Sequence, residues 1–271
     1  MFTRILIPTD GFGLEDHAII YAAQVFPDAE FHVISVVDTK VHGIQYTTML
    51  QDIMDESAGN ALSHAEELFS EHGVKVKVKQ VLYGIPSKVI NNYANENEAT
   101  FIIVRSYCQH GLHSPVLGST IENLLKRTKV PVMVLSVAVD GVKPSRVLLA
   151  SDGTHLSKNA ENFALQFCQS LGATLVCLFV ANPKKRGHVE FGKKVMINLG
   201  WKAKQLGVTV EEKLSTGDLD TSVIEASQNA QVVIMGAGRK NFLKRVVIGH
   251  MARCTCATSE KPVILVRGSG I

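Results

Sequence analysis

Short apolar runs alternate with helix-like segments along the whole chain. The runs are four to nine residues long, and turn residues separate them from segments of helical periodicity such as Ser157–Leu171 and Asp218–Asn229. Runs of this length predict buried strands, and strands that alternate with helices form a parallel sheet covered by helices. The ten predicted strands are Ile5–Thr9, Phe31–Val37, Val74–Leu82, Phe101–Val104, Pro131–Val137, Val147–Ser151, Thr174–Ala181, Val208–Leu214, Gln231–Met235 and Pro262–Arg267.

One predicted strand, Val74–Leu82, differs because valine and lysine alternate strictly over its first half. Strict alternation predicts one buried and one exposed face, and lysines discourage pairing at the edge of a sheet. We therefore expect this strand at an outer position.

The chain repeats itself. The segment Thr3–Gly11 returns as Ser145–Gly153 at an offset of 142 residues, and the later landmark Gly118 returns as Gly249 at an offset of 131. The second copy is therefore shorter, and the difference falls opposite Val41–Ser57. That stretch is predicted to be a long connection or an added helical turn.

Turn-forming glycine and proline between two apolar runs mark the boundary of the copies, at Gly141 and Pro144. We predict two α/β domains, residues 1–141 and 142–271. Each is predicted to be a Rossmann-like domain with an open five-stranded, mostly parallel sheet and helices on both faces.

The composition favours a compact globular protein. Hydrophobic residues make up 46% of the chain and charged residues 20%, which excludes disorder over most of its length. No apolar run approaches the roughly 18 residues of a membrane span, and we expect no signal peptide. The five cysteines are odd in number and irregular in spacing, which is typical of reduced thiols and predicts a cytoplasmic protein.

The small net charge of +3 conceals a division. Residues 1–141 hold 10 basic and 16 acidic residues, whereas residues 142–271 hold 18 and 9. A positive second half attracts polyanions such as phosphates. Neutral drift of solvent-exposed residues explains the same difference in charge between the two halves.

Ligands of open α/β sheets bind at the carboxyl ends of the strands, so the residues there are the candidates for a site. Glycines let backbone amides approach a phosphate, and helix N-termini favour anions. The candidates in the two copies are Asp10-Gly11 and Asp152-Gly153 after the first strand, Arg105 and Gly236-Ala237-Gly238-Arg239 after the fourth, and Gly118-Ser119 and Gly249-His250 at the next helix.

The segment Met235–Gly249 resembles the signature loop of universal stress proteins, which reads G-x2-G-x9-G-[S/T] in nucleotide-binding members. The resemblance covers nearly the whole chain, twice, and includes the Asp-Gly pair after the first strand and the Gly217-Asp218 turn. It implies Rossmann-like domains of the HUP type, in which the aspartate and a valine of the second strand hold adenosine, while the glycine loop holds phosphates. The implied site residues are Asp152, Val180, Gly236, Gly238, Arg239, Gly249 and His250 in the second copy, and Asp10, Val36, Gly118 and Ser119 in the first.

Both copies depart from this signature. Counting nine residues back from Gly249 reaches Arg239, with Gly238 one place early, and His250 replaces the Ser/Thr. In the first copy the same count reaches Cys108 and then Arg105, so the early glycines are lost. These arginines either pair with a phosphate or fill its space. The nucleotide loop is therefore predicted to be degenerate in the first domain and partial in the second.

The resemblance implies a stress-response or regulatory protein, not an enzyme, that binds ATP or a related adenine nucleotide in its second domain, with or without Mg²⁺. A second hypothesis is a scaffold or interaction module without nucleotide, built as an intramolecular pseudo-dimer and able to form a homodimer. In that case Asp152 only caps the helix that follows. A third is an enzyme of the wider adenine-nucleotide-binding group, against which the lack of a Ser-His-Asp order, HExxH or GxxxxGK[ST] motif argues.

Three further features carry no predicted function. Cys108, His110 and His113 are ligand types that Zn²⁺ accepts, but no second ligand pair follows, so we predict solvated loop residues and no metal site. Cys254 and Cys256 point to different faces of a predicted helix. The basic run Lys184-Lys185-Arg186 is interpreted as a solvated face rather than a nucleic-acid contact, and no membrane partner is predicted.

Overall fold

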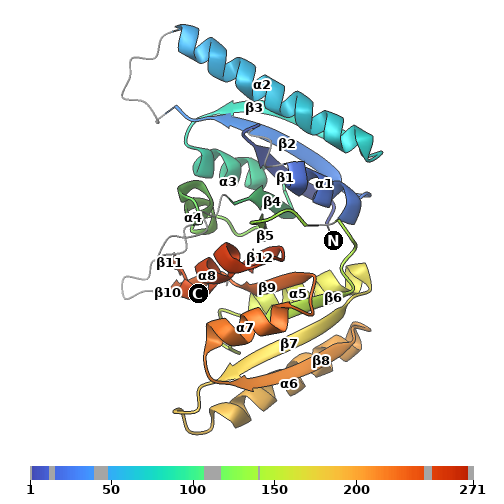
Figure 1. The fold of residues 1–271 in the computed structure, drawn as a ribbon, viewed down its shortest axis with the longest axis vertical. Coiled ribbons are helices and arrows are strands. Elements are labelled where there is room, and N and C mark those ends of the chain that lie inside the picture. The colour runs from blue at the N-terminus through green and yellow to red at the C-terminus, as the bar shows by residue number, and fades with distance from the viewer. Residues whose placement is uncertain are drawn as a thin grey trace. The chain divides into compact units, whose positions relative to one another are not determined.

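The computed structural model describes residues 2–11, 16–39, 48–106, 117–139, 141–240 and 246–267, with the backbone alone described at 238–240 and 246–247. The chain divides into two compact units. Residues 2–106 and 118–142 form the first, and the second begins at residue 143. Each unit has its own five-stranded sheet (Figure 1).

Strands and helices alternate through both units. The first contains β1 (Arg4–Thr9), α1 (Asp16–Val25), β2 (Glu30–Val37), α2 (Thr48–Glu71), β3 (Val76–Tyr83), α3 (Pro86–Glu96), β4 (Phe101–Arg105), α4 (Ser119–Leu125) and β5 (Val132–Leu135). The second contains β6 (Arg146–Ala150), α5 (Lys158–Leu171), β7 (Thr174–Ala181), α6 (His188–Gln205), β8 (Val210–Thr216), α7 (Leu219–Ser227), β9 (Val232–Gly236), β10 (Gly238–Lys240), β11 (Val246–Ile248), α8 (His250–Thr258) and β12 (Val263–Val266).

The two sheets have the same topology. The strand order is β3-β2-β1-β4-β5 in the first unit and, written in the corresponding direction, β8-β7-β6-β9-β12 in the second. The described pairings within each sheet are parallel. The chain reverses its direction of travel across the sheet between β1 and β4, and again between β6 and β9. A crevice opens at the carboxyl ends of such neighbouring strands.

Helices cover both faces of each sheet. Right-handed crossovers place α1 and α2 on one face of the first sheet and α3 and α4 on the other, and the helices of each pair contact each other. The central strands β4 and β9 are apolar and buried up to their last residue, which is partly exposed. Among the described residues, no helix combines the length and the apolar character that crossing a membrane requires.

The predicted fold class is confirmed, and each predicted strand is found within a few residues of its expected bounds. The lysine-bearing strand β3 is an outer strand, with Lys75, Lys77 and Lys79 exposed. Two details differ. The strand β5 is shorter than Pro131–Val137, and β10 and β11 form an antiparallel hairpin within the glycine loop that was not predicted.

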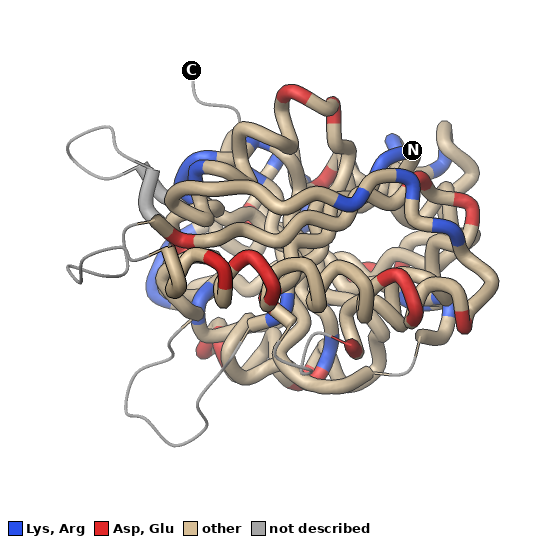
Figure 2. Tube along the Cα trace, turned by 90° about the horizontal axis from the view of Figure 1, so that it is seen from above, with Lys and Arg blue, Asp and Glu red and all other residues tan. Residues whose placement is uncertain are grey.

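The extra residues of the first copy extend a helix. The helix α2 has 24 residues against 18 in its counterpart α6. It carries six acidic residues and no lysine or arginine, whereas α6 carries four lysines and one glutamate; Figure 2 marks these charges along the trace. The outer surface of α6 also exposes Ile197 and Trp201.

Candidate functional site

A pocket of about 940 Å³ lies at the carboxyl edge of the second sheet. It is lined from the ends of β6, β7 and β9 and from the first turns of α6, α7 and α8, so it occupies the crevice that the strand order predicts. Its lining includes Ser151, Asp152, Thr154, Ser157, Val180, Lys184, Lys185, His188, Phe191, Gly217, Gly236, Gly249 and His250.

The turn after β6 is held by its own side chains. The Oδ1 atom of Asp152 accepts hydrogen bonds from the backbone N and the hydroxyl of Thr154, at 3.0 and 2.7 Å. Helix α5 begins only at Lys158, with Ser157 as its N-cap residue. The alternative role of Asp152 as a cap for the following helix is therefore wrong, because the aspartate closes a local turn instead.

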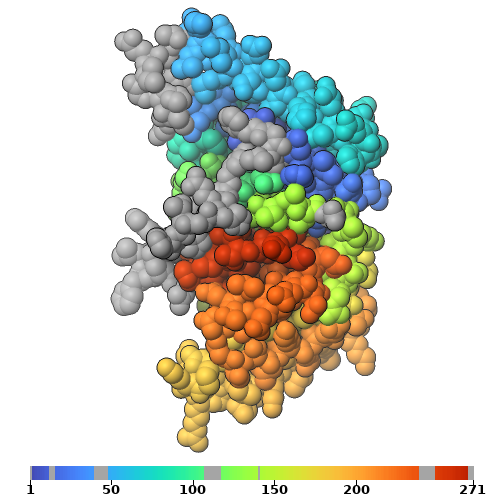
Figure 3. Space-filling view, viewed as in Figure 1, coloured from blue at the N-terminus to red at the C-terminus, as the bar shows by residue number. Residues whose placement is uncertain are grey.

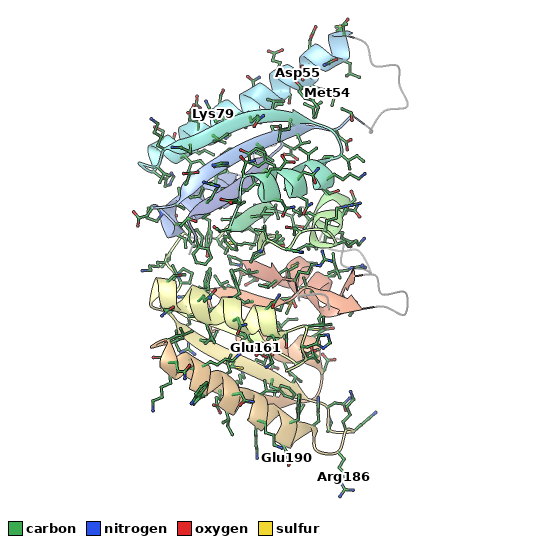
Figure 4. All side chains as sticks on the ribbon, turned by 180° about the vertical axis from the view of Figure 1, so that it is seen from behind. Met54, Asp55, Lys79, Glu161, Arg186 and Glu190 are labelled. Atoms are coloured by element: carbon green, nitrogen blue, oxygen red, sulfur yellow. The ribbon has the colours of Figure 1, made fainter. Side chains whose placement is uncertain are left out.

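A buried carboxylate fixes this turn to α5. Glu161, labelled in Figure 4, is 2% exposed and accepts a hydrogen bond of 2.8 Å from the Ser151 hydroxyl. Its second oxygen accepts from the Lys158 ammonium, also at 2.8 Å. The Ser151 oxygen in turn accepts from the backbone N of Gly153. The pocket wall at β6 is thus tied to the helix behind it.

Two lysines at the pocket were missed by the sequence analysis. Lys184 and Lys185 follow β7 and line the pocket, whereas their sequence suggested only a solvated basic face. Nearby, Nδ1 of His188 accepts a hydrogen bond of 2.8 Å from the backbone N of Asn182. The sequence did contain a signal for these lysines, because they follow the second predicted strand of the copy. All parallel strands of a sheet end at the same edge, so residues that follow any of them are candidates for the site.

Five of the seven residues predicted for the second domain line this one pocket: Asp152, Val180, Gly236, Gly249 and His250. The other two, Gly238 and Arg239, belong to β10, and the side chain of Arg239 lies outside the described part of the chain. Gly249 is the N-cap residue of α8 and has no side chain to bond the helix start.

The second turn of α8 carries a thiol. Cys254 lies one turn after His250, and burial together with the carboxylate of Asp220 raises the pKa of this thiol. Cys256 is fully buried while Cys254 is partly exposed, which agrees with the prediction that the two cysteines point to different faces.

A pocket of about 420 Å³ in the first unit is lined by Gly11 and by residues of α2. The predicted residues are not part of its lining, namely Asp10, Val36, Gly118 and Ser119. Gly118 precedes α4 as its N-cap residue, and Ser119 is the first residue of that helix.

Arg105 ends β4 as Gly236 ends β9, so an arginine stands where the second unit has a glycine. Its Nε and Nη1 atoms are buried and have no hydrogen-bond partner within the described ranges. The predicted loop residues Cys108, His110 and His113 lie outside those ranges.

Fold and pocket together define a tandem α/β protein whose two Rossmann-like domains share one topology, with a pocket at the switch point of the second. The Universal stress protein family matches residues 1–136 and 144–267, and the chain belongs to this family.

Known relatives agree with this assignment. Universal stress protein MJ0531 of Methanocaldococcus jannaschii is 28% identical over 141 residues, which are 50% of this chain and 82% of that protein. The crystal structure of a universal stress protein from Archaeoglobus fulgidus DSM 4304 has a TM-score of 0.78 at 22% identity and covers 99% of this chain and 98% of that chain. It shows that the whole tandem arrangement has the same fold.

A universal stress protein in complex with cAMP is also similar, with a TM-score of 0.40 and 20% identity over 50% of this chain and 97% of that chain. That similarity is too distant to bear on the ligand of this protein.

Proposed function

We propose that the second domain binds an adenine nucleotide, with ATP as the first candidate, and that the protein is a non-enzymatic regulator of a cytoplasmic stress response. The observation that carries the proposal is the gathering of Asp152, Val180, Gly236 and Gly249 around one pocket. Its volume of about 940 Å³ falls within the roughly 300–1,000 Å³ typical of small-molecule sites.

The pocket offers a polar group for each end of a nucleotide. The Oδ2 atom of Asp152 has no partner among the described residues and can accept from a ribose hydroxyl or an adenine amine, while Oδ1 is held by Thr154. The N-terminus of α8, with Gly249 before it, suits a phosphate. Lys184 and Lys185 add positive charge at the same pocket.

A magnesium ion would come with the phosphates. Asp152 is the only carboxylate in the described part of the lining and is assigned to the adenosine end, so phosphate oxygens and water would supply the ligands of the Mg²⁺ ion. We therefore treat Mg²⁺ as part of the ligand.

The proposal includes no catalysis. His188 already uses Nδ1 as an acceptor, and no hydrogen bond joins a histidine to Ser151, Thr154 or Ser157 in the described structure. A nucleophile that is activated by a base needs such a contact. The pairing of the domains as a pseudo-dimer, and of chains as a homodimer, stays a prediction.

Isothermal titration of the full chain with Mg-ATP tests the proposal. Asp152→Asn keeps an oxygen that can accept from Thr154 but removes the negative charge, and we expect the Kd to rise about tenfold, because a hydrogen bond to a charged group contributes about 1.5–3 kcal/mol. The matched control is Asp10→Asn in the first repeat, which should leave the Kd unchanged.

A second variant tests the pocket by filling it. A Cβ at Gly236 would meet its nearest atom, the Leu156 carbonyl oxygen, at 3.7 Å, so Gly236→Leu is compatible with the backbone and should abolish binding. Absence of binding to the unmodified chain at millimolar Mg-ATP, with the fold intact by circular dichroism, would overturn the proposal and leave the scaffold hypothesis. Turnover of ATP would contradict its non-enzymatic part.

A further inference from the structure

Three side chains of types that bind metal ions meet where α7 and α8 begin. His250 and Cys254 are four residues apart on α8 and share one face of it, and Asp220 comes from the first turn of α7. Their ligand atoms all lie within 4.8 Å of one another. The two helices contact each other and form adjacent orange and red areas in Figure 3. We propose that Asp220, His250 and Cys254 bind a divalent transition-metal ion of the zinc class.

The distances fit a tetrahedral ion after small side-chain rotations. With bond lengths of about 2.0–2.3 Å, neighbouring ligand atoms of tetrahedral zinc lie about 3.3–3.6 Å apart. The Sγ atom of Cys254 is 3.3 Å from Nε2 of His250, and that nitrogen is 4.0 Å from Oδ2 of Asp220. The imidazole is 73% exposed and the carboxylate 40% exposed, so both side chains can rotate to close the remaining gap.

The carboxylate of Asp220 provides a second, independent observation. Its Oδ1 atom is buried and has no hydrogen-bond partner among the described residues. A buried carboxylate oxygen without a partner is unfavourable, and the other oxygen, Oδ2, lies 4.0 Å from Nε2 of the exposed His250 imidazole. A bound dication would neutralise this carboxylate.

The ligand set selects the class of metal. Thiolate and imidazole ligands favour zinc and its neighbours over Mg²⁺ and Ca²⁺, which prefer oxygen alone. Three protein ligands leave one coordination position open. Binding of the metal ion requires no nucleotide. The test of the metal site is therefore independent of the test of ATP binding, even though His250 also lines the pocket.

Titration of the reduced, full-length protein with Co²⁺ tests the site, because cobalt bound by a thiolate gives a charge-transfer absorption band. The parent protein carries Cys108→Ser, which removes the other thiol that has histidines close by in the sequence. We expect one equivalent of Co²⁺ to produce the band and Zn²⁺ to displace it. Cys254→Ser should abolish the band.

Two more variants and a control complete the test. His250→Ala and Asp220→Asn change exposed or half-exposed side chains, and each should weaken Zn²⁺ binding by at least about tenfold. A loss of that size is usual even when the mutated residue only forms a hydrogen bond to a metal ligand. His155→Ala, at an exposed histidine outside the cluster, should have no effect. A band that persists in Cys254→Ser, or no band in the parent, would overturn the proposal and leave a hydrogen-bonded surface cluster.

Discussion

Gly11 and Gly153 have the same surroundings in the two repeats. Both have positive φ, +77° and +68°, and the backbone N of each donates to the hydroxyl two residues earlier, Thr9 in one case and Ser151 in the other. Each also contacts the helix that follows the second strand of its unit. The repeated glycine of the Asp-Gly pair therefore has a structural cause that is independent of any ligand.

Replacing Gly153 by alanine should be more costly than conformational strain alone. A Cβ at Gly153 would lie 2.3 Å from Cγ2 of Val195, whereas Gly172 has nearly the same φ, +69°, and nothing within 4 Å. Left-handed backbone costs about 1–2 kcal/mol for a residue with Cβ, and overpacking adds about 1–3 kcal/mol. Urea unfolding should show a larger loss of stability for Gly153→Ala than for Gly172→Ala, and equal losses would refute the steric argument.

At this scale the sequence indicates residues that follow predicted strands. Asp152, Gly236 and Gly249 were found in this way, and they line the pocket. Asp220 and Cys254 were not, because their proximity depends on how α7 packs against α8, which no local pattern encodes. The spacing of His250 and Cys254 on one helix was the only local signal.

Among the elements, α6 contains two glycines in contrasting environments. A Cβ at Gly192 would lie 2.5 Å from the ring of Phe179, because the helix packs closely on β7 there. At Gly200 the nearest atom, a carboxylate oxygen of Glu212, would be 3.5 Å away. The first glycine permits close packing of helix on sheet, and the second only lowers helix propensity.

The two glycines should therefore respond in opposite directions to alanine. Gly200→Ala should raise the free energy of unfolding by about 0.5–1 kcal/mol. Gly192→Ala gains the same propensity but must displace the buried Phe179 ring, for a net loss of about 1–2 kcal/mol. Thermal or urea denaturation of both variants measures this, and stabilisation of both would show that the ring can move freely.

The N-terminus of α7 gives a pH-dependent prediction. Asp218 is its N-cap residue, and the backbone N and the hydroxyl of Thr221 both donate to its Oδ1 at 2.9 Å. These hydrogen bonds, the backbone one first, lower the pKa of the carboxyl below its ordinary value of 3.8. The stabilisation is therefore complete above that value and is lost as the pH falls through the lower pKa of the folded protein.

Asp218→Ala should consequently reduce stability at about pH 6 and have a diminishing effect below about pH 3. Urea unfolding of both proteins across this range measures the difference. Asp28→Ala, at an exposed aspartate in a turn, serves as the control. A difference that stays constant down to the lowest pH would mean that the charge of Asp218 contributes nothing.

Strands were the most predictable elements, because buried parallel strands are continuous apolar runs that end at turn residues. The hairpin of β10 and β11 was missed for a physical reason. Gly238–Lys240 has little strand propensity, and it pairs with Val246–Ile248 over only three residues, which is too short for a periodic pattern to be recognised.

At the scale of the whole molecule, one sequence pattern has produced two domains with one topology and different sites. The topology follows from apolar runs that both copies keep. The sites differ because single positions at the strand ends differ, as where Arg105 replaces the counterpart of Gly236. Fold was therefore predictable for both units, whereas the shape of each pocket was not.

Hydrogen exchange should separate the two domains. If the second binds nucleotide, saturating Mg-ATP stabilises it by mass action, by about 2.7 kcal/mol at one hundred times the Kd. Amides near residues 150–154 and 249–252 should then exchange more slowly, while those near residues 9–11 and 118–120 keep their rates. Equal protection of both sets would place ligand in the first domain as well.

The exposed side chain of Trp201 on α6 has an optical consequence. It is the only tryptophan of the chain, and all five tyrosines precede residue 142. Excitation at the red edge of the absorption band therefore reports on the second domain alone, without a label. Because Phe191 and Val195 of the same helix contact the turn at Gly153, the emission of Trp201 is a native fluorescent readout of events that move this helix.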